Sequence, residues 1–130
     1  MEPFESVIVH LDTSVLIDAL VGPRPLLADL TSLTERGDRP VISTIVLYEW
    51  LRGPRTRADL IAQEDLFPRG EALPFGVVEA DLAAKLYNRV RRARQREFDL
   101  AVAACAIVHG GALWTLNRDD FKDIPDLRLV

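Results

Sequence analysis

The sequence predicts a single α/β domain in which a central, mostly parallel β-sheet is flanked by helices. Short apolar segments typical of strands alternate with longer segments whose apolar residues recur every three or four positions, as on a buried helix face. The chain of 130 residues is long enough to bury a sizeable core. Because no repeat, low-complexity tract or linker interrupts it, residues 1–130 are expected to form one domain.

The first half of the chain is predicted to hold two strands and four helices. Its first strand is almost entirely apolar, which is typical of a strand covered on both faces. Glycine and proline pairs separate the segments that follow. The predicted elements, in order, are a strand at 7–11, helices at 15–20 and 26–34, a strand at 41–43, and helices at 45–51 and 57–65.

The second half is predicted to begin with a loop at 67–75 that contains a short strand around 72–73. A period of four in the apolar residues then predicts a long helix at 77–94. An alanine-rich helix at 99–109 ends at two glycines and leads into a buried strand at 112–116. A short edge strand is predicted at 127–130.

The composition excludes several classes of protein. Apolar residues make up 48% and charged residues 28% of the chain, close to the average of globular proteins. The longest apolar runs are far shorter than the roughly 20 residues of a membrane span, and the N-terminus lacks the features of a signal peptide. The one cysteine, Cys105, excludes an intrachain disulfide and a multi-cysteine zinc site. A cytosolic protein is therefore expected.

The net charge of −4 gives no global signal for nucleic-acid binding, but the basic residues are unevenly distributed. Five arginines lie within residues 89–96, just before Asp99. Such a cluster usually forms a solvated helix face. Here it can also reach the mouth of a site near Asp99, and the candidates for contact with phosphate groups are Arg92, Arg94 and Arg96.

Acidic residues follow the predicted strands at the end where functional sites of open parallel sheets gather. Asp12 directly follows the first strand, and Asp119 and Asp120 come shortly after the strand at 112–116. Glu49 lies about one turn into the helix after the second strand, and Asp99 opens a later helix. Individually, these residues could be helix caps or solvated surface groups. Only the fold can bring them together.

Carboxylates that converge without basic partners repel each other, so such a cluster is costly unless a cation neutralises it. Mg²⁺ and Mn²⁺ suit it because these hard ions prefer oxygen ligands. His10 and His109 are isolated and show no metal-ligand spacing. An all-oxygen cluster is typical of metal-assisted phosphodiester hydrolysis, in which one metal lowers the pKa of a water molecule and a second stabilises the leaving oxygen.

Four segments that span most of the chain resemble, in order and at typical spacing, the motifs of PIN-domain ribonucleases. They are LDTSVLI at 11–17, STIVLYEWLRG at 43–53, FDLAVAACA at 98–106 and TLNRDDF at 115–121. Each motif alone is a weak signal, but the four together are specific. The small single-domain size is similar to that of VapC-type toxins of toxin–antitoxin pairs.

This resemblance implies a three-layer PIN-like fold and a Mg²⁺- or Mn²⁺-dependent endoribonuclease. It also implies an RNA substrate, an antitoxin partner and a homodimer. Asp12, Glu49 and Asp99 fall on the first three metal-site acids of the family. Asn117 stands where the family usually has a fourth acid, and Asp120 is the preferred substitute, with Asp119 the second choice.

Further side chains receive roles from the same resemblance. Thr13 and Thr115 are expected to hydrogen-bond the metal-site acids, and Arg92, Arg94 and Arg96 to contact RNA. A groove for an antitoxin segment is expected on the helices between 15 and 65, which are rich in leucine. Core packing explains most of these leucines. They are Leu26, Leu27, Leu30, Leu33, Leu47, Leu51 and Leu60.

Two other functions remain open at this point. A non-catalytic binding module that keeps the fold and loses the second metal is compatible with the neutral amide of Asn117. An aspartate-based phosphatase of the haloacid-dehalogenase type would also place Asp12 after the first strand. Such an enzyme usually has a second aspartate where Ser14 stands, and a lysine before the late acids, where this chain has none.

Overall fold

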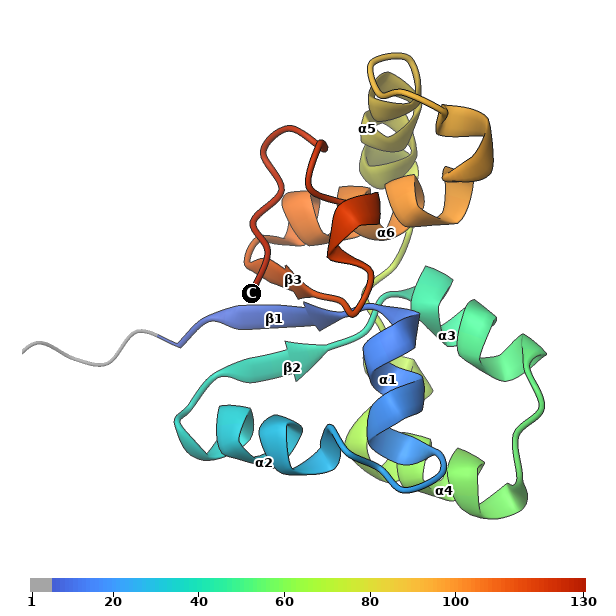
Figure 1. Ribbon diagram of the computed structural model, residues 1–130, viewed down its shortest axis with the longest axis vertical. Helices are drawn as coiled ribbons and strands as arrows, with labels where there is room; N and C mark the ends of the chain where they lie inside the picture. Colours follow the sequence, from blue (N-terminus) through green and yellow to red (C-terminus); the bar gives the residue numbers. More distant parts are fainter. Residues whose placement is uncertain (1–5) are drawn as a thin grey trace, which may run out of the picture.

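The computed structural model describes residues 6–130 and shows an α/β fold built around a three-stranded parallel sheet (Figure 1). Strand β1 (Ile8–Leu11) is central, between β2 (Arg39–Val41) and β3 (Ala112–Trp114). Val9 is paired with Pro40 on one side and Ala112 on the other. The predicted fold class, a parallel sheet flanked by helices, is therefore confirmed.

Within the described residues, six α-helices and three short 3-10 helices surround this sheet. In Figure 1, α1, α2 and α4 gather on the β2 side of the molecule, whereas α5 and α6 lie on the β3 side. No helix in residues 6–130 is long and apolar enough to cross a membrane. The helices are α1 (Thr13–Leu20), α2 (Leu27–Glu35), α3 (Thr44–Arg52), α4 (Arg57–Leu66), α5 (Val77–Tyr87) and α6 (Glu97–His109), and the 3-10 helices are η1 (Arg69–Glu71), η2 (Ala93–Gln95) and η3 (Arg118–Asp120).

The core forms around the central strand. Val9 and Leu11 of β1 are 2% and 0% exposed, and they belong to one apolar cluster with Leu16, Trp50 and Leu113. Burial of such side chains is the main favourable contribution to folding. Since the strands run in the same direction, the segments that follow their carboxyl ends meet at one edge of the sheet.

The strands differ from their predicted bounds for local reasons. Strand β2 starts at Arg39, not at residue 41, because the Arg39 N–H donates to the Val7 carbonyl at 2.9 Å. Pro40 lacks an N–H group, which an edge strand tolerates. Strand β3 ends at Trp114 because the Thr115 hydroxyl accepts a hydrogen bond from the Asn117 N–H and turns the chain. The predicted strands around 72–73 and at 127–130 are reduced to single bridges, Ser43 to Leu73 and Leu113 to Leu129.

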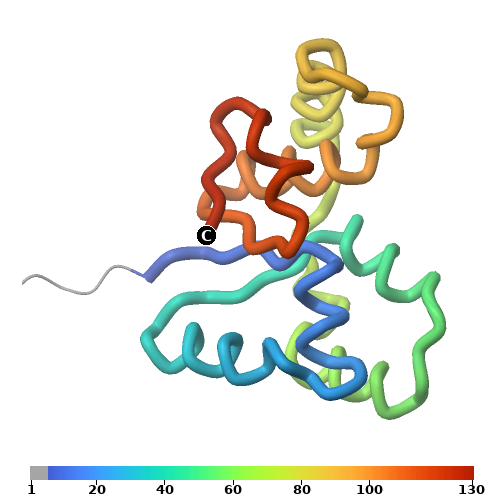
Figure 2. The backbone as a smooth tube through the Cα atoms, viewed as in Figure 1, coloured from blue at the N-terminus to red at the C-terminus, as the bar shows by residue number. Residues whose placement is uncertain are grey.

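The prediction of one helix over 77–94 is wrong beyond residue 87. Helix α5 ends at Tyr87, and the chain turns back through η2 before α6 begins (Figure 2). Arg92 has a left-handed backbone with φ of 52°, which an α-helix does not contain. The turn is held by Arg96, whose Nη1 donates to the Arg91 carbonyl at 2.9 Å.

Candidate active site

Asp12 lies between the carboxyl end of β1 and the start of α1, and 5% of its surface is exposed. Its side chain makes no capping hydrogen bond. One carboxylate oxygen, Oδ2, instead accepts from the Thr115 hydroxyl at 2.7 Å and the Ser14 hydroxyl at 3.1 Å. Two hydroxyls from opposite ends of the chain thus hold Asp12 in one orientation. Ser14 was missed by the sequence reasoning, although it lies only two residues beyond Asp12.

Glu49 is directed toward the same edge by α3. The helix begins where the Ser43 hydroxyl accepts from the Val46 N–H at 3.2 Å, and Glu49 follows about one turn later. Its Oε1 accepts from the Thr13 hydroxyl at 2.8 Å, while Oε2 lies 3.6 Å from Nη2 of Arg52. Thr13 and Thr115 therefore each donate to an acidic side chain, as the sequence predicted.

Asp99 lies in the first turn of α6 and is partly buried. Burial raises its pKa to about 6, and the negative charges of Asp12, Asp120 and Glu49 add to this effect, whereas Arg96 opposes it. The charges of the other three acids therefore all act on Asp99. These residues are distant in sequence, and the fold brings them into one negatively charged neighbourhood.

The last segment distinguishes the two neighbouring aspartates. Both aspartates border the hollow, but only the charge of Asp120 adds to the effect of burial that raises the pKa of Asp99. The Asp119 side chain is 90% exposed and pairs with Lys122 at 3.0 Å. Asn117 is exposed, and its N–H donates to the Thr115 hydroxyl at 3.0 Å, which joins it to the Asp12 network.

A hard divalent cation fits the donor chemistry of this neighbourhood. The donors are carboxylate oxygens, and their mutual repulsion is what a bound cation would neutralise. Between residues 6 and 130, however, no three acidic, histidine or cysteine side chains already stand in an arrangement that could enclose a metal ion. The histidines lie elsewhere: His10 bonds to the Gly110 carbonyl at 2.7 Å, and His109 lies 3.2 Å from Glu79.

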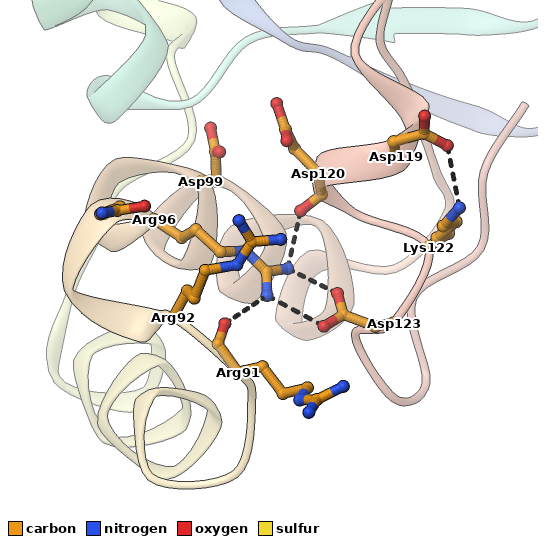
Figure 3. A pocket seen from close by; sticks show the side chains of 9 residues that line it. Arg91, Arg92, Arg96, Asp99, Asp119, Asp120, Lys122 and Asp123 are labelled. Atoms are coloured by element: carbon orange, nitrogen blue, oxygen red, sulfur yellow. Dashed lines mark hydrogen bonds and ion pairs between the residues drawn. The ribbon is translucent and has the colours of Figure 1, made fainter.

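A hollow of about 650 Å³ is lined by Asp99 and Asp120, two of these acids (Figure 3). Arg96 crosses its base, where it pairs with both oxygens of Asp123 and donates from Nη2 to the Asp120 carbonyl at 2.7 Å. Arg96 is thus a link between the α5–α6 loop and the η3 turn, and Asp123 is a partner that the sequence reasoning did not identify. Arg92 also lines the hollow, but Arg94 does not.

Comparison with known proteins agrees with this architecture. The sequence profile of the PIN domain matches residues 9–127. Ribonuclease VapC of Rickettsia bellii is 33% identical in a match that covers 92% of this chain and 92% of that protein. Ribonuclease VapC19 of Mycobacterium tuberculosis is 31% identical, with 91% of this chain and 95% of that protein covered.

Solved structures show the same fold at lower identity. DNA-bound VapBC from Salmonella typhimurium superimposes with a TM-score of 0.75 at 23% identity, over 95% of this chain and 97% of that chain. VapBC2 from Rickettsia felis, bound to a promoter DNA fragment, gives 0.73 at 22% identity, with 95% of this chain and 97% of that chain covered.

Proposed function

The chain belongs to the PIN-domain family and, within it, to the VapC ribonucleases, the toxins of VapBC toxin–antitoxin systems, and we propose that it hydrolyses RNA phosphodiester bonds with the help of Mg²⁺ or Mn²⁺. The observation that carries this proposal is the hydroxyl network in which Thr115 donates to Asp12 at 2.7 Å and Thr13 donates to Glu49 at 2.8 Å, near enough to Asp99 for both acids to act on its charge. In this proposal the four carboxylates and the Asn117 amide hold the metal.

The protein's own residues prepare this site before any metal binds. Thr115 and Ser14 occupy one oxygen of Asp12, which leaves Oδ1 free of hydrogen bonds within residues 6–130. Thr13 fixes Glu49 in the same way. A bound divalent ion supplies an activated water and stabilises the negative charge that develops on the phosphate. The residues that hold the carboxylates limit the reorganisation that metal and substrate binding require.

The geometry does not support the alternative of an aspartate-based phosphatase. Ser14 donates to Asp12 and supplies no second acid there. The chain has two lysines, and neither faces Asp12, since Lys85 pairs with Asp81 at 2.8 Å and Lys122 with Asp119 at 3.0 Å. The remaining alternative is a binding module without catalytic activity, and a measurement of RNA cleavage tests it.

An antitoxin partner follows from the family, and a shallow groove between α2 and α4 offers a place for it. The groove has a volume of about 260 Å³ and is lined by Leu27, Leu30 and Leu66 among others. Of the leucines expected to form a groove, Leu30 and Leu33 are buried at 3% exposure, while Leu27 stays partly accessible. We assign the antitoxin segment to this groove.

Two further assignments follow from the family. Homodimers are supported by the apolar surface of α5, where Val77 and Val78 are 87% and 63% exposed. We also propose a cytoplasmic location, because the proposed substrate is cellular RNA.

The test is cleavage of a labelled RNA pool by the purified protein. Cleavage should need Mg²⁺ or Mn²⁺ and should stop when EDTA is added. An intact RNA pool under both metals, with a folded protein, would leave only the binding-module alternative.

A further inference from the structure

Arg92 has an unusual backbone for an arginine. It lies just before η2 with φ of 52° and ψ of 38°, in the left-handed region that strains every residue with a Cβ atom. Glycine would adopt this conformation without strain. Strained residues are frequent at binding sites, where the surrounding structure holds a side chain in place. The strained backbone therefore directs attention to where the Arg92 side chain lies and what it could bind.

The Arg92 side chain lines the hollow that Asp99 and Asp120 also line. In Figure 3 it extends from the loop in the same direction as Arg96, toward the side of the hollow bordered by Asp99 and Asp120. The two arginines differ in their partners. Arg96 has both ends of its guanidinium bound by Asp123 and two carbonyls, whereas the Arg92 guanidinium has no hydrogen bond or ion pair in the described part of the chain.

We propose that Arg92 binds a phosphate group of the RNA strand adjacent to the phosphate that is cleaved. This inference rests on the proposed ribonuclease function. It selects Arg92 from the three arginines that the sequence offered, because Arg96 is occupied in holding the loop and Arg94 lies outside the hollow. A guanidinium presents two parallel N–H donors that match two phosphate oxygens.

Charge complementarity supports RNA as the ligand. The acids repel an RNA backbone, and a free cation at their border offsets that repulsion for a strand that crosses the hollow. A phosphate bound at Arg92 would fix the register of the strand, because phosphate contacts position a nucleic acid without reading its sequence.

The experiment separates the charge of Arg92 from its backbone strain. Arg92→Gly removes both, and Arg92→Asn removes the charge while keeping a residue that tolerates the left-handed region. Arg94→Ala is the charge control, since it lies in the same loop but outside the hollow. Arg24→Gly is the backbone control, because Arg24 also has a positive φ, of 56°, and does not line the hollow.

Two properties are measured: the melting temperature, and binding of a short fluorescein-labelled single-stranded RNA of random sequence, without divalent metal and over a salt series. Both Arg92 variants should bind the RNA about ten-fold more weakly. Their slope of log affinity against log salt should be smaller by about 0.7. The melting temperature of Arg92→Gly should hold or rise. Arg94→Ala should lose less than about two-fold in affinity, and Arg24→Gly should bind as the wild type does.

Three results would overturn the inference. Equal losses of affinity in the Arg92 and Arg94 variants would mean that only the general charge of the loop acts on RNA. Wild-type affinity in Arg92→Asn would exclude a phosphate contact. A lower melting temperature in both Arg92 variants would assign the side chain to folding. Failure of the ribonuclease proposal looks different, because the wild-type protein itself would then leave RNA uncleaved in Mg²⁺ and Mn²⁺.

Discussion

At the scale of single residues, hydroxyl groups organise the acidic site. The Ser14 hydroxyl accepts from the Leu116 N–H at 3.2 Å, and the Thr115 hydroxyl accepts from the Asn117 N–H at 3.0 Å, so each is left to donate its proton to Asp12. These bonds connect the start of α1 with the segment after β3. The two donated hydrogen bonds orient the Asp12 carboxylate, which suits a ligand for a cation.

Asp12→Asn is expected to abolish metal-dependent RNA cleavage with little loss of stability. An amide oxygen can still accept from Thr115 and Ser14, and removal of one negative charge relieves part of the repulsion that, after burial, raises the pKa of Asp99. The free energy of unfolding without metal should change by less than about 1 kcal/mol. The measurements are cleavage of labelled RNA and thermal unfolding.

Asp119→Asn, at an exposed acid, is the control and should retain activity. Retained cleavage by Asp12→Asn would exclude Asp12 as the main ligand. A large fall in its melting temperature would indicate a structural role instead.

Asp120 rather than Asp119 is expected to bind metal. The negative charge of Asp120 adds to the effect of burial that raises the pKa of Asp99, and the Asp120 carbonyl accepts from Arg96 at 2.7 Å. Asp119 instead faces solvent beside Lys122. Titration with Mn²⁺ should show about ten-fold weaker binding for Asp120→Ala and a change below about two-fold for Asp119→Ala. Equal losses, or a loss confined to Asp119→Ala, would show that the assignment is wrong.

At the scale of helices and strands, sequence patterns predicted the features that depend on residues close together in the chain. An apolar strand followed by Asp12 is such a local signal, and the structure confirms the strand. The end of α5 was not predictable in this way. The period of four continues to Val90, but the chain turns because Arg96 meets Asp123, a partner 27 residues away.

The same limit applies to the candidate site. The family motifs predicted the acids and the threonines that donate to two of them. Asp12 follows a strand, whereas Glu49 and Asp99 lie in helices. Which arginine faces the hollow could not be read from sequence, because Arg92, Arg94 and Arg96 differ in their long-range partners and not in their local pattern.

Asp38 links the approach to β1 with the start of β2, and this link should depend on pH. Its oxygens accept from the Val7 N–H at 3.0 Å and from Arg36 Nε at 2.7 Å, which holds the pKa of Asp38 below its ordinary value of 3.8. A group whose pKa is lowered by folding stabilises the fold above its unfolded pKa, and this stabilisation is lost as the pH falls through the folded pKa.

Asp38→Asn should therefore lower the melting temperature at pH 7, and the difference from wild type should shrink as the pH falls below about 3.8. Asp65→Asn, at an exposed position, provides the control and should show no such pattern. A difference that stays constant over this pH range would mean that the carboxylate charge of Asp38 does not stabilise the fold.

At the scale of the whole molecule, the proposed sites for RNA and antitoxin lie on different elements. The hollow is bordered by the α5–α6 loop, the start of α6 and the η3 segment, whereas the leucine groove lies between α2 and α4, on the β2 side of the sheet (Figure 1). Substitutions in one site should therefore leave the other intact, since sites without shared contacts behave nearly independently.

Leu66→Glu tests this separation. Leu66 is 49% exposed and lines the groove, so a carboxylate there places a charge against any apolar antitoxin segment without disturbing the core. Binding of the antitoxin coded beside this protein should weaken by about ten-fold or more, measured by co-purification and titration, while RNA cleavage by the free toxin stays at the wild-type rate.

Ile61→Glu is the matched control, because Ile61 lies on the same helix, is 52% exposed and does not line the groove. If both variants lose the antitoxin equally, general charge on α4 is responsible; if neither does, the antitoxin binds elsewhere on the molecule.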